Sequence, residues 1–374
     1  MQEFNMFSYA FSLQGKSHKA KNVCCQDSNQ IIKVENLYVA AVADGVGSAA
    51  NSKEGSAIAV NVATDYFSKN YDKNSNIKLL IKQSFAEALN RIFEDAKNNN
   101  LPIESYDTTL TMAVYDGQKI VFGHSGDGAI IGLTNSGDFI EITSVQKGLE
   151  RETVVPLRAG SDVWQIDTCD KNLAAILLLT DGMLDIICQP RLKLDKTGAG
   201  VYVPLASYFL DLKDVSRNQT AADVTKNIEE FVTADKDYNE DAFYARLSAI
   251  YKQHLSEEDT NQLIEEIKKS NVPVDSMQNV TDDKTVVALI NTNVVIENKS
   301  LGFYKDPDWR AIYNAWYREL YPHLCQNKEE SSDEKLVRVS EDKDVKEEIV
   351  SKEQELESEK NDNFNNEGYL LFEK

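Results

Sequence analysis

The chain has 374 residues, of which 42% are hydrophobic and 9% aromatic, and its formal net charge is -21. This length and composition are typical of a soluble folded protein with a large core, arranged as one large domain or two smaller ones. The negative charge, with no cluster of Lys and Arg, argues against nucleic acid and acidic membranes as partners.

Cellular location is indicated by two absences. No segment reaches the ~20 apolar residues that a membrane span needs, and residues 1–20 lack the pattern of a signal peptide. The five cysteines are odd in number and irregularly spaced, which favours reduced thiols over disulfides. The pair Cys24-Cys25 has no second Cys or His pair at zinc spacing, so we do not expect it to bind zinc. We therefore expect a cytoplasmic protein.

The N-terminal part begins with strands and continues with helices. Residues 6–14 and 37–43 are apolar enough to predict two strands. Ser52 is expected to cap a helix that runs to about Ser68. An apolar stripe from Ile77 to Ile92 predicts a second helix.

Short strands joined by glycine-containing turns follow. The predicted strands span residues 109–115, 119–123, 129–133 and 138–142. The linking turns are Asp116-Gly117, Ser125-Gly126-Asp127-Gly128 and Asn135-Ser136-Gly137. Links of this length are typical of hairpins, so an antiparallel sheet is expected here.

A helical insertion separates the last two predicted strands. Those strands span residues 173–179 and 286–290, and the insertion covers about residues 204–275. Its helices are expected over residues 221–233, 240–255 and 256–270, the last with a Ser256 start. The two strands can be neighbours only if the insertion leaves and re-enters the same sheet.

The sequence after residue 295 has a different character. Residues 296–326 are rich in aromatic side chains, and residues 327–374 are dense in charged and polar ones. We expect an acidic, disordered tail over residues 327–374, since so few apolar residues cannot offset the entropy of ordering. The aromatic segment is either a docking element for a kinase, a substrate or the catalytic domain, or a helix packed on the fold.

Acidic motifs lie beside turn-forming residues at the ends of apolar runs. Asp44 follows the strand at residues 37–43, Asp181 follows the strand at 173–179, and Asp282 and Asp283 precede the last strand. No Lys or Arg lies within those apolar runs, so divalent cations are the simplest source of neutralising charge. The sequence therefore predicts a polynuclear metal site.

Each motif alone also has an ordinary explanation. Asp44 with Gly45 could be a turn, although a glycine lets its carbonyl oxygen approach a metal as a neutral ligand. Asp181 could cap a helix, with Asp185 one turn on and solvated. Asp27 and Asp127 are typical of turns, and His124 lies in a strand-like run, as a core histidine would.

The order of the motifs is more specific than any one of them. In chain order they are Gly15-Lys16-Ser17-His18, Gln26-Asp27-Ser28, Val42-Ala43-Asp44-Gly45-Val46-Gly47-Ser48, Gly55-Ser56, Thr108-Thr109, Gly123-His124-Ser125-Gly126-Asp127-Gly128, Leu179-Thr180-Asp181-Gly182 and Asp282-Asp283-Lys284-Thr285-Val286-Val287. Together they resemble the metal-dependent serine/threonine protein phosphatases of type 2C, most of all a bacterial branch of that family. The resemblance covers residues 7 to 295, with the insertion only loosely matched.

This resemblance implies an α+β fold, a four-layer α-β-β-α sandwich of two antiparallel sheets flanked by helices. The phosphatase domain would span residues 1–295, including the helical insertion. Two ions, Mn²⁺ or Mg²⁺, would activate water for attack on phosphorus, with no covalent phospho-enzyme. Carboxylate oxygens suit these ions better than zinc.

Metal ligands follow from the resemblance, motif by motif. Asp44 would bridge both ions, the Gly45 carbonyl would bind one of them, and Asp181 and Asp282 would bind the other. Asp127 and Asp185 fall where some family members bind a third, weaker metal.

Two further carboxylates are expected to act beside the metals. Asp27 would hold water at the ions. Asp283 stands where relatives often have Asn, which favours a supporting role over ligation.

The sequence departs from the family at two positions. Many relatives hold the substrate phosphate with an Arg where this chain has Asn22; Lys16 and Lys21 are nearby alternatives without the bidentate fork of Arg. Many relatives donate a proton from a His where this chain has Val46. His18 is the candidate general acid in its place.

Three functions agree with these residues. The leading one is hydrolysis of phosphoserine and phosphothreonine in phosphoproteins, with a cognate Ser/Thr kinase or its targets as partners. Asn22 and Val46 leave open a phosphatase-like regulatory binding module with little turnover. The motifs equally allow a hydrolase of small phosphate esters.

Overall fold

In the computed structural model of the protein, the described residues are 5–147, 154–187, 191–193, 200–202, 205–210, 240–269 and 281–305. They belong to one compact unit, Met1–Pro307. The second unit, Asp308–Lys374, lies outside the described residues. The predicted acidic tail and most of the aromatic segment therefore lie outside them too.

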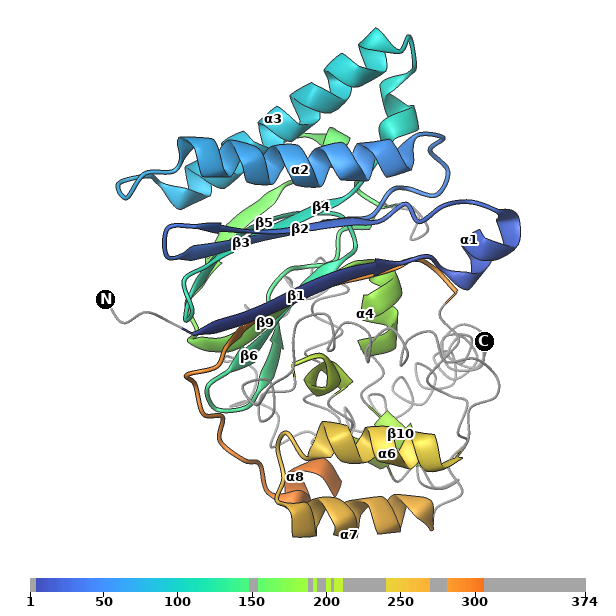
Figure 1. Ribbon diagram of the computed structural model, residues 1–374, viewed down its shortest axis with the longest axis vertical. Helices are drawn as coiled ribbons and strands as arrows, with labels where there is room; N and C mark the ends of the chain where they lie inside the picture. Colours follow the sequence, from blue (N-terminus) through green and yellow to red (C-terminus); the bar gives the residue numbers. More distant parts are fainter. Residues whose placement is uncertain are drawn as a thin grey trace, which may run out of the picture. The chain divides into compact units, whose positions relative to one another are not determined.

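Two five-stranded antiparallel sheets form the centre of this unit (Figure 1). Sheet 1 has the order β1-β12-β9-β6-β7, which are Met6–Leu13, Lys284–Asn291, Leu173–Leu179, Ala129–Thr134 and Phe139–Glu141. Sheet 2 has the order β2-β3-β4-β5-β8, which are Ser28–Val34, Leu37–Ala43, Leu110–Tyr115, Ile120–Ser125 and Gln165–Cys169. The predicted α+β class is confirmed, and β12 does return beside β9 after the insertion.

Helices cover the outer faces of both sheets. On sheet 2 lie α2 (Ser52–Asn70) and α3 (Ile77–Asn98), whose apolar stripes share a core with it. On sheet 1 lie α4 (Asp181–Ile187) and the short helix η3 (Leu205–Phe209). A third apolar layer fills the space between the sheets. These layers confirm the four-layer sandwich.

The remaining described elements are short or lie in the insertion. They are α1 (Lys16–Lys21), η1 (Ile103–Tyr106), η2 (Leu157–Ala159), β10 (Arg191–Lys193), β11 (Gly200–Tyr202), α6 (Glu240–Tyr251), α7 (Glu257–Lys268) and α8 (Leu301–Lys305). The predicted helix at residues 221–233 lies outside the described residues. None of the described helices combines the length and the apolar character needed to cross a membrane.

Strand β9 is an example of why the strands near the motifs are apolar at every position: both of its faces are buried. All seven of its residues are fully buried. Leu177 and Leu179 face the layer that contains α4, whereas Ile176 and Leu178 face sheet 2. A strand covered on both faces cannot alternate apolar with polar residues.

The prediction of a hairpin at Ser125-Gly126-Asp127-Gly128 is wrong. The strand before it, β5, pairs with β4 and β8, whereas the strand after it, β6, pairs with β9 and β7. The segment therefore crosses from sheet 2 to sheet 1. The cause is that β5 and β6 find their partners far along the chain, which local turn chemistry does not reveal.

Several element boundaries also differ from the expectation. Strand β2 and helix α1 were not predicted, and β12 begins two residues early, at Lys284. Asn51, not Ser52, occupies the position before α2, without a side-chain cap. Ser256 does cap α7, since its Oγ accepts a hydrogen bond from Asp259 N at 3.1 Å.

Candidate metal centre

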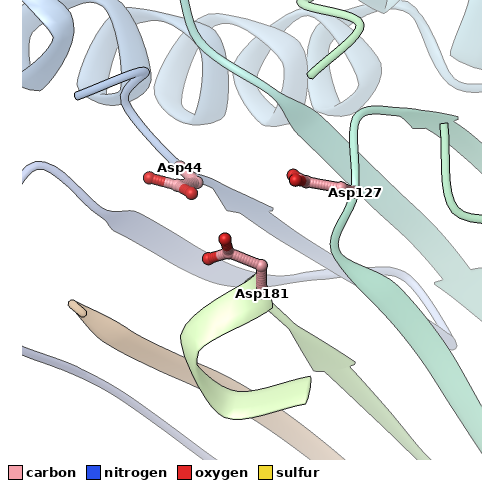
Figure 2. A group of neighbouring side chains, drawn as sticks. All are labelled: Asp44, Asp127 and Asp181. Atoms are coloured by element: carbon pink, nitrogen blue, oxygen red, sulfur yellow. The ribbon is translucent and has the colours of Figure 1, made fainter. Parts of the chain in front are cut away.

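Three carboxylates converge at one end of the sandwich. Asp44, Asp127 and Asp181 each offer an oxygen, and these oxygens lie within 4.8 Å of one another (Figure 2). They come from the end of β3, the link between β5 and β6, and the start of α4. All three are half-buried. A set of carboxylate oxygens from separate elements is the kind of site that Mg²⁺ and Mn²⁺ prefer.

Asp44 is fixed by its backbone. Its N–H donates to Thr109 Oγ1 at 2.8 Å, and its carbonyl oxygen accepts from Thr108 Oγ1 at 2.9 Å and from Thr109 N at 2.8 Å. A Cβ on Gly45 would lie 2.7 Å from the Ser52 carbonyl oxygen, so the start of α2 needs a glycine there. The Thr108-Thr109 pair thus holds the end of β3 in place.

Asp127 reaches the centre because its neighbours are glycines. Gly126 has a φ of +134°, and a Cβ on it would lie 2.6 Å from the Cβ of Thr109, which directly precedes β4 of sheet 2. A Cβ on Gly128 would clash with the Leu179 carbonyl oxygen in sheet 1. The link is therefore wedged between the two sheets, with Asp127 at its middle.

Asp181 is the first residue of α4. Its Oδ1 accepts a hydrogen bond from Gly182 N at 2.6 Å. The free N–H groups at a helix start favour a carboxylate there. Asp185 follows on the same helix, but its side chain lies outside the described part.

Asp27 is buried where the sheets meet. Its Oδ2 accepts from Thr180 Oγ1 at 2.8 Å, and Thr180 Oγ1 in turn accepts from Thr285 N at 3.1 Å. Its Oδ1 has no hydrogen-bond partner among the described residues. Burial raises the pKa of Asp27 to about 6, although its contacts with Asp44, Thr285 and Thr180 oppose the shift.

The carboxylates of this cluster repel one another when no cation neutralises their charge. Burial, followed by repulsion from Asp27 and Asp181, raises the pKa of Asp44 well above its usual range. Such shifts mean that the protein destabilises its own carboxylates. The orphaned Asp27 Oδ1 and the clustered oxygens of Asp44, Asp127 and Asp181 together fit divalent metal ions.

Asp282 lies beside this cluster without joining it. It is exposed, its Oδ1 accepts from Asp283 N at 2.8 Å, and its Cβ is 3.4 Å from the position of a Cβ on Gly182. The structure therefore places Asp282 next to the start of α4. Among the described residues, the grouped metal-ligand oxygens are those of Asp44, Asp127 and Asp181.

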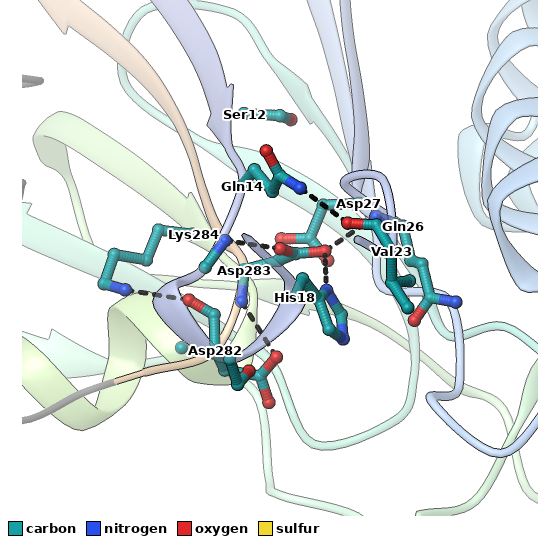
Figure 3. A network of polar contacts seen from close by, with 12 residues as sticks. Ser12, Gln14, His18, Val23, Gln26, Asp27, Asp282, Asp283 and Lys284 are labelled. Atoms are coloured by element: carbon teal, nitrogen blue, oxygen red, sulfur yellow. Dashed lines mark hydrogen bonds and ion pairs between the residues drawn. The ribbon is translucent and has the colours of Figure 1, made fainter. Parts of the chain in front are cut away.

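His18 lies against Asp283, a contact that the sequence alone did not indicate (Figure 3). His18 Nδ1 is 2.8 Å from Asp283 Oδ2, which is an ion-pair distance without the direction of a hydrogen bond. The buried Asp283 carboxylate also accepts from Gly15 N at 2.6 Å and from Gln26 N at 2.7 Å. The available signal was an Asp where relatives often have Asn.

The cations near the centre differ from those expected. Asn22 has a φ of 56° and closes α1 as its C-cap, a left-handed conformation that Asn tolerates. Lys16 and Lys21 are exposed at the two ends of α1. Lys284 is instead buried, and its Nζ donates to the Asp282 carbonyl oxygen at 2.7 Å. Burial lowers the pKa of Lys284 while Asp282 and Asp283 raise it, so this cation offsets part of the local negative charge.

His124 is a buried core residue, as predicted, and the thiol of Cys25 is shielded by its surroundings. Cys25 is partly buried, and its burial with the neighbouring Asp27 raises the pKa of the thiol to about 12, which keeps it unreactive. His124 is fully buried, with Nδ1 2.8 Å from Thr111 Oγ1, and burial lowers the pKa of its ring to about 4.

Comparison with known proteins gave a family and several solved structures. The model of the family described as protein phosphatase 2C matches residues 14–232. A search of curated proteins found no match. A serine/threonine phosphatase from S. agalactiae is 13% identical, with a TM-score of 0.47, over 76% of this chain and 99% of its own.

Two other solved structures are similar at the same level. The serine/threonine phosphatase PstP/Ppp of Mycobacterium tuberculosis is 13% identical, with a TM-score of 0.45, over 78% of this chain and 99% of its own. RsbX in complex with magnesium is 13% identical, with a TM-score of 0.41, over 78% of this chain and 96% of its own. Because the family model spans more than half of the sequence, the chain belongs to the protein phosphatase 2C family and is a protein serine/threonine phosphatase.

Proposed function

We propose that the protein hydrolyses phosphoserine and phosphothreonine in proteins at a centre of two Mn²⁺ or Mg²⁺ ions. Asp44, Asp181, Asp282 and the Gly45 carbonyl would hold the two ions, and Asp127 with Asp185 would hold a third. The observation that carries this proposal is the convergence of Asp44, Asp127 and Asp181 oxygens within 4.8 Å. When bound, the ions supply an acidified water and stabilise charge on the transferring phosphoryl group.

Asp27 and His18 are the proposed proton-handling residues. Thr180 Oγ1 occupies Asp27 Oδ2, which leaves Oδ1 to accept a hydrogen bond from the attacking water. His18 Nδ1 lies at ion-pair distance from Asp283, and Nε2 is the nitrogen that would face a substrate. Hydrolysis of a phosphate ester requires two proton transfers. A base takes a proton from the attacking water, and an acid gives a proton to the leaving oxygen.

Substrate and partner follow from the family. We propose a phosphoprotein substrate and, as partner, a cognate Ser/Thr kinase or its targets, acting in the cytosol. The described cysteines Cys24, Cys25 and Cys169 are free thiols, which supports a reducing compartment. We keep residues 1–295 as the proposed catalytic domain, with an insertion at about 204–275; helices α6 and α7 support the latter.

The metal assignment is tested with Mn²⁺ alone and with a phosphoserine peptide. Asp44→Asn should weaken Mn²⁺ binding in calorimetry and lower kcat/KM by about 100-fold or more, because it removes a ligand and leaves its neighbours unscreened. Asp65→Asn is the matched control, since Asp65 is an exposed partner of Lys69 on α2. Full activity in EDTA, or an Asp44→Asn enzyme as active as Asp65→Asn, would contradict the proposal.

A regulatory binding module is the second candidate. It is favoured by Asn22, whose backbone closes α1, and by Val46, whose N–H is tied to the Asp107 carbonyl oxygen at 3.0 Å. Tight phosphopeptide binding without turnover, at saturating Mn²⁺, would favour the module. Turnover of p-nitrophenyl phosphate but not of phosphopeptides would instead favour a hydrolase of small esters.

A further inference from the structure

Asp283 connects three parts of the chain at once. Its side chain is 2% exposed, and it accepts hydrogen bonds from Gly15 N at 2.6 Å and Gln26 N at 2.7 Å. His18 Nδ1 lies 2.8 Å from the same Oδ2 that accepts from Gln26. A buried carboxylate with several donors is strongly directional, because moving it would leave those donors unpaired.

The segment that carries His18 is fastened at both ends. Ser17 N and Ser17 Oγ both donate to the Thr281 carbonyl oxygen at 3.0 Å. A Cβ on Gly15 would clash with the Asp282 backbone, so the chain passes directly over it. Val23 N donates to the His18 carbonyl oxygen at 2.9 Å. The His18 backbone is thereby fixed, and its ring nitrogen Nδ1 lies within ion-pair distance of Asp283.

The pair lies beside the proposed centre. Gln26 bonds to Asp283 and is followed directly by Asp27, and Figure 3 shows Asp27, Asp283 and His18 side by side. Asp282, a proposed metal ligand, directly precedes Asp283. The His18 side chain is 15% exposed, so the ring is held in the protein yet reaches solvent.

We propose that Asp283 is a positioning residue that holds His18 as the proton donor to the leaving seryl or threonyl oxygen. This inference rests on the proposed function. Histidine held by a carboxylate at Nδ1 presents Nε2 in one tautomer and one orientation. The pair supplies the proton donor that Val46 cannot.

The step balances as a hydrolysis. The oxygen of water forms the new bond to phosphorus while the bond from phosphorus to the seryl or threonyl oxygen breaks. That oxygen takes the Nε2 proton of the doubly protonated His18 ring, which leaves a neutral ring with its proton on Nδ1, and the water gives one proton to Asp27 Oδ1. Solvent returns this proton to His18, and the products are the free hydroxyl side chain and inorganic phosphate.

The test compares two substrates that differ in their need for a proton donor. The seryl oxygen of a phosphoserine peptide is a poor leaving group that needs a proton. The leaving group of p-nitrophenyl phosphate is p-nitrophenolate, which is stable without one. Asp283→Asn and His18→Gln should each lower kcat on the peptide by about 10- to 100-fold. On p-nitrophenyl phosphate each should stay within about threefold of the native enzyme. The double variant should be no slower than His18→Gln alone.

Ser17→Ala is the matched control for a loosened loop. It removes the Ser17 Oγ bond to Thr281 but leaves the His18 and Asp283 pair intact, so the ratio of the two rates should not change. Equal losses on both substrates, or additive losses in the double variant, would overturn the inference. Such results would leave the phosphatase assignment standing, because the native enzyme would still turn over both substrates.

A second readout does not depend on activity. Nitrogen NMR of the full chain at alkaline pH, where imidazoles are neutral, should show the His18 proton on Nδ1, and Asp283→Asn should shift it toward Nε2. An unchanged tautomer would contradict the positioning role. Absence of turnover by the native enzyme on either substrate would contradict the proposed function, and the NMR result would then still decide the pairing.

Discussion

Asp27 accepts a hydrogen bond from Thr180, which directly follows strand β9 of sheet 1. Thr180 Oγ1 donates to Asp27 Oδ2 at 2.8 Å and accepts from Thr285 N at 3.1 Å. Thr180→Val keeps the shape of the side chain but leaves two buried groups unpaired. We expect it to lower the free energy of unfolding by about 1–3 kcal/mol and to raise the pKa of Asp27 further. Denaturant unfolding of the metal-free protein measures the loss.

Thr64→Val is the matched control for that measurement. Thr64 is also buried, and its Oγ1 donates at 2.9 Å to the Val60 carbonyl oxygen within α2. No charged group loses a partner there, so the cost should stay within about 1 kcal/mol. A Thr180→Val cost no larger than the Thr64→Val cost would show that Asp27 does not need this hydroxyl.

His124 should make the protein sensitive to acid. Burial lowers the pKa of the folded-state ring from 6.5 to about 4. Between these pH values the unfolded chain binds more protons than the folded one, so stability rises with pH there. The free energy of unfolding is unaffected by this ring above pH 6.5. It falls as the pH is lowered to about 4, by up to about 3 kcal/mol in total. His124→Gln should flatten the dependence of unfolding free energy on pH in chelator; an unchanged slope would contradict it.

The sequence identifies the charged residues of the site better than it identifies their hydrogen-bond partners. Asp44 and Asp181 are visible because each directly follows an apolar strand. Thr180 and Asp27 lie 153 residues apart, and Gly15 and Asp283 lie 268 apart. Contacts over such separations depend on sheet order, which no local pattern contains. The contacts of Asp283 with Gly15 and His18 therefore became visible only in the fold.

At the scale of elements, the link between β5 and β6 determines whether the two sheets present their acids together. Gly128→Ala would push a methyl group against the Leu179 carbonyl oxygen in sheet 1. We expect at least a tenfold loss of Mn²⁺ affinity, because Asp127 and the neighbouring strand end would have to move. Calorimetric titration with Mn²⁺ measures this.

Gly160→Ala is the control that introduces backbone strain without displacing the link between β5 and β6. Gly160 has a φ of +95°, and a Cβ there would meet nothing within 4 Å. It should cost about 1 kcal/mol of stability and leave Mn²⁺ affinity unchanged. If both alanine variants bind Mn²⁺ like the native protein, the link does not set the geometry of the centre.

Strand patterns and strand partners differ in how far sequence predicts them. The runs of β3, β9 and β12 were recognisable because they are continuously apolar, and the stripe of α3 because its apolar residues repeat with the helical period. The split between β5 and β6 was not, since a glycine-rich link serves a hairpin and a crossing between sheets equally well. Edge strand β2 was missed because its described residues are mostly half-buried and mixed in character.

At the scale of the whole molecule, the start of the aromatic segment packs on the insertion. Tyr304 in α8 is buried, its ring centroid lies 5.4 Å from that of Tyr251, and Lys305 Nζ lies 2.6 Å from Glu266. Outside the insertion, Lys299 Nζ lies 2.6 Å from Asp138, the residue before β7. For residues 301–305, the structure agrees with a packed helix; the rest of the segment lies outside the described residues.

Two shortened chains test that packing. A chain ending at Val295 lacks Tyr304 and should lose about 3–5 kcal/mol relative to a chain ending at Lys305. Its Tm should fall by about 6 °C or more. Thermal unfolding of both chains with chelator measures the difference. Equal Tm values would show that α8 contributes no stability.

The pairing of β1 with β12 has a consequence for how the enzyme is made. Met6 pairs with Asn291, so the first strand of sheet 1 meets its described neighbour only after almost three hundred residues have been synthesised. Contacts this distant in sequence form late, because the intervening chain must first be closed into a loop. His18 and Asp283 sit at the other end of the same pairing. A ribosome-bound chain from which β12 has not yet emerged therefore lacks the contact between His18 and Asp283. If the proposed roles of these residues hold, phosphatase activity should begin only when synthesis of the domain is nearly complete.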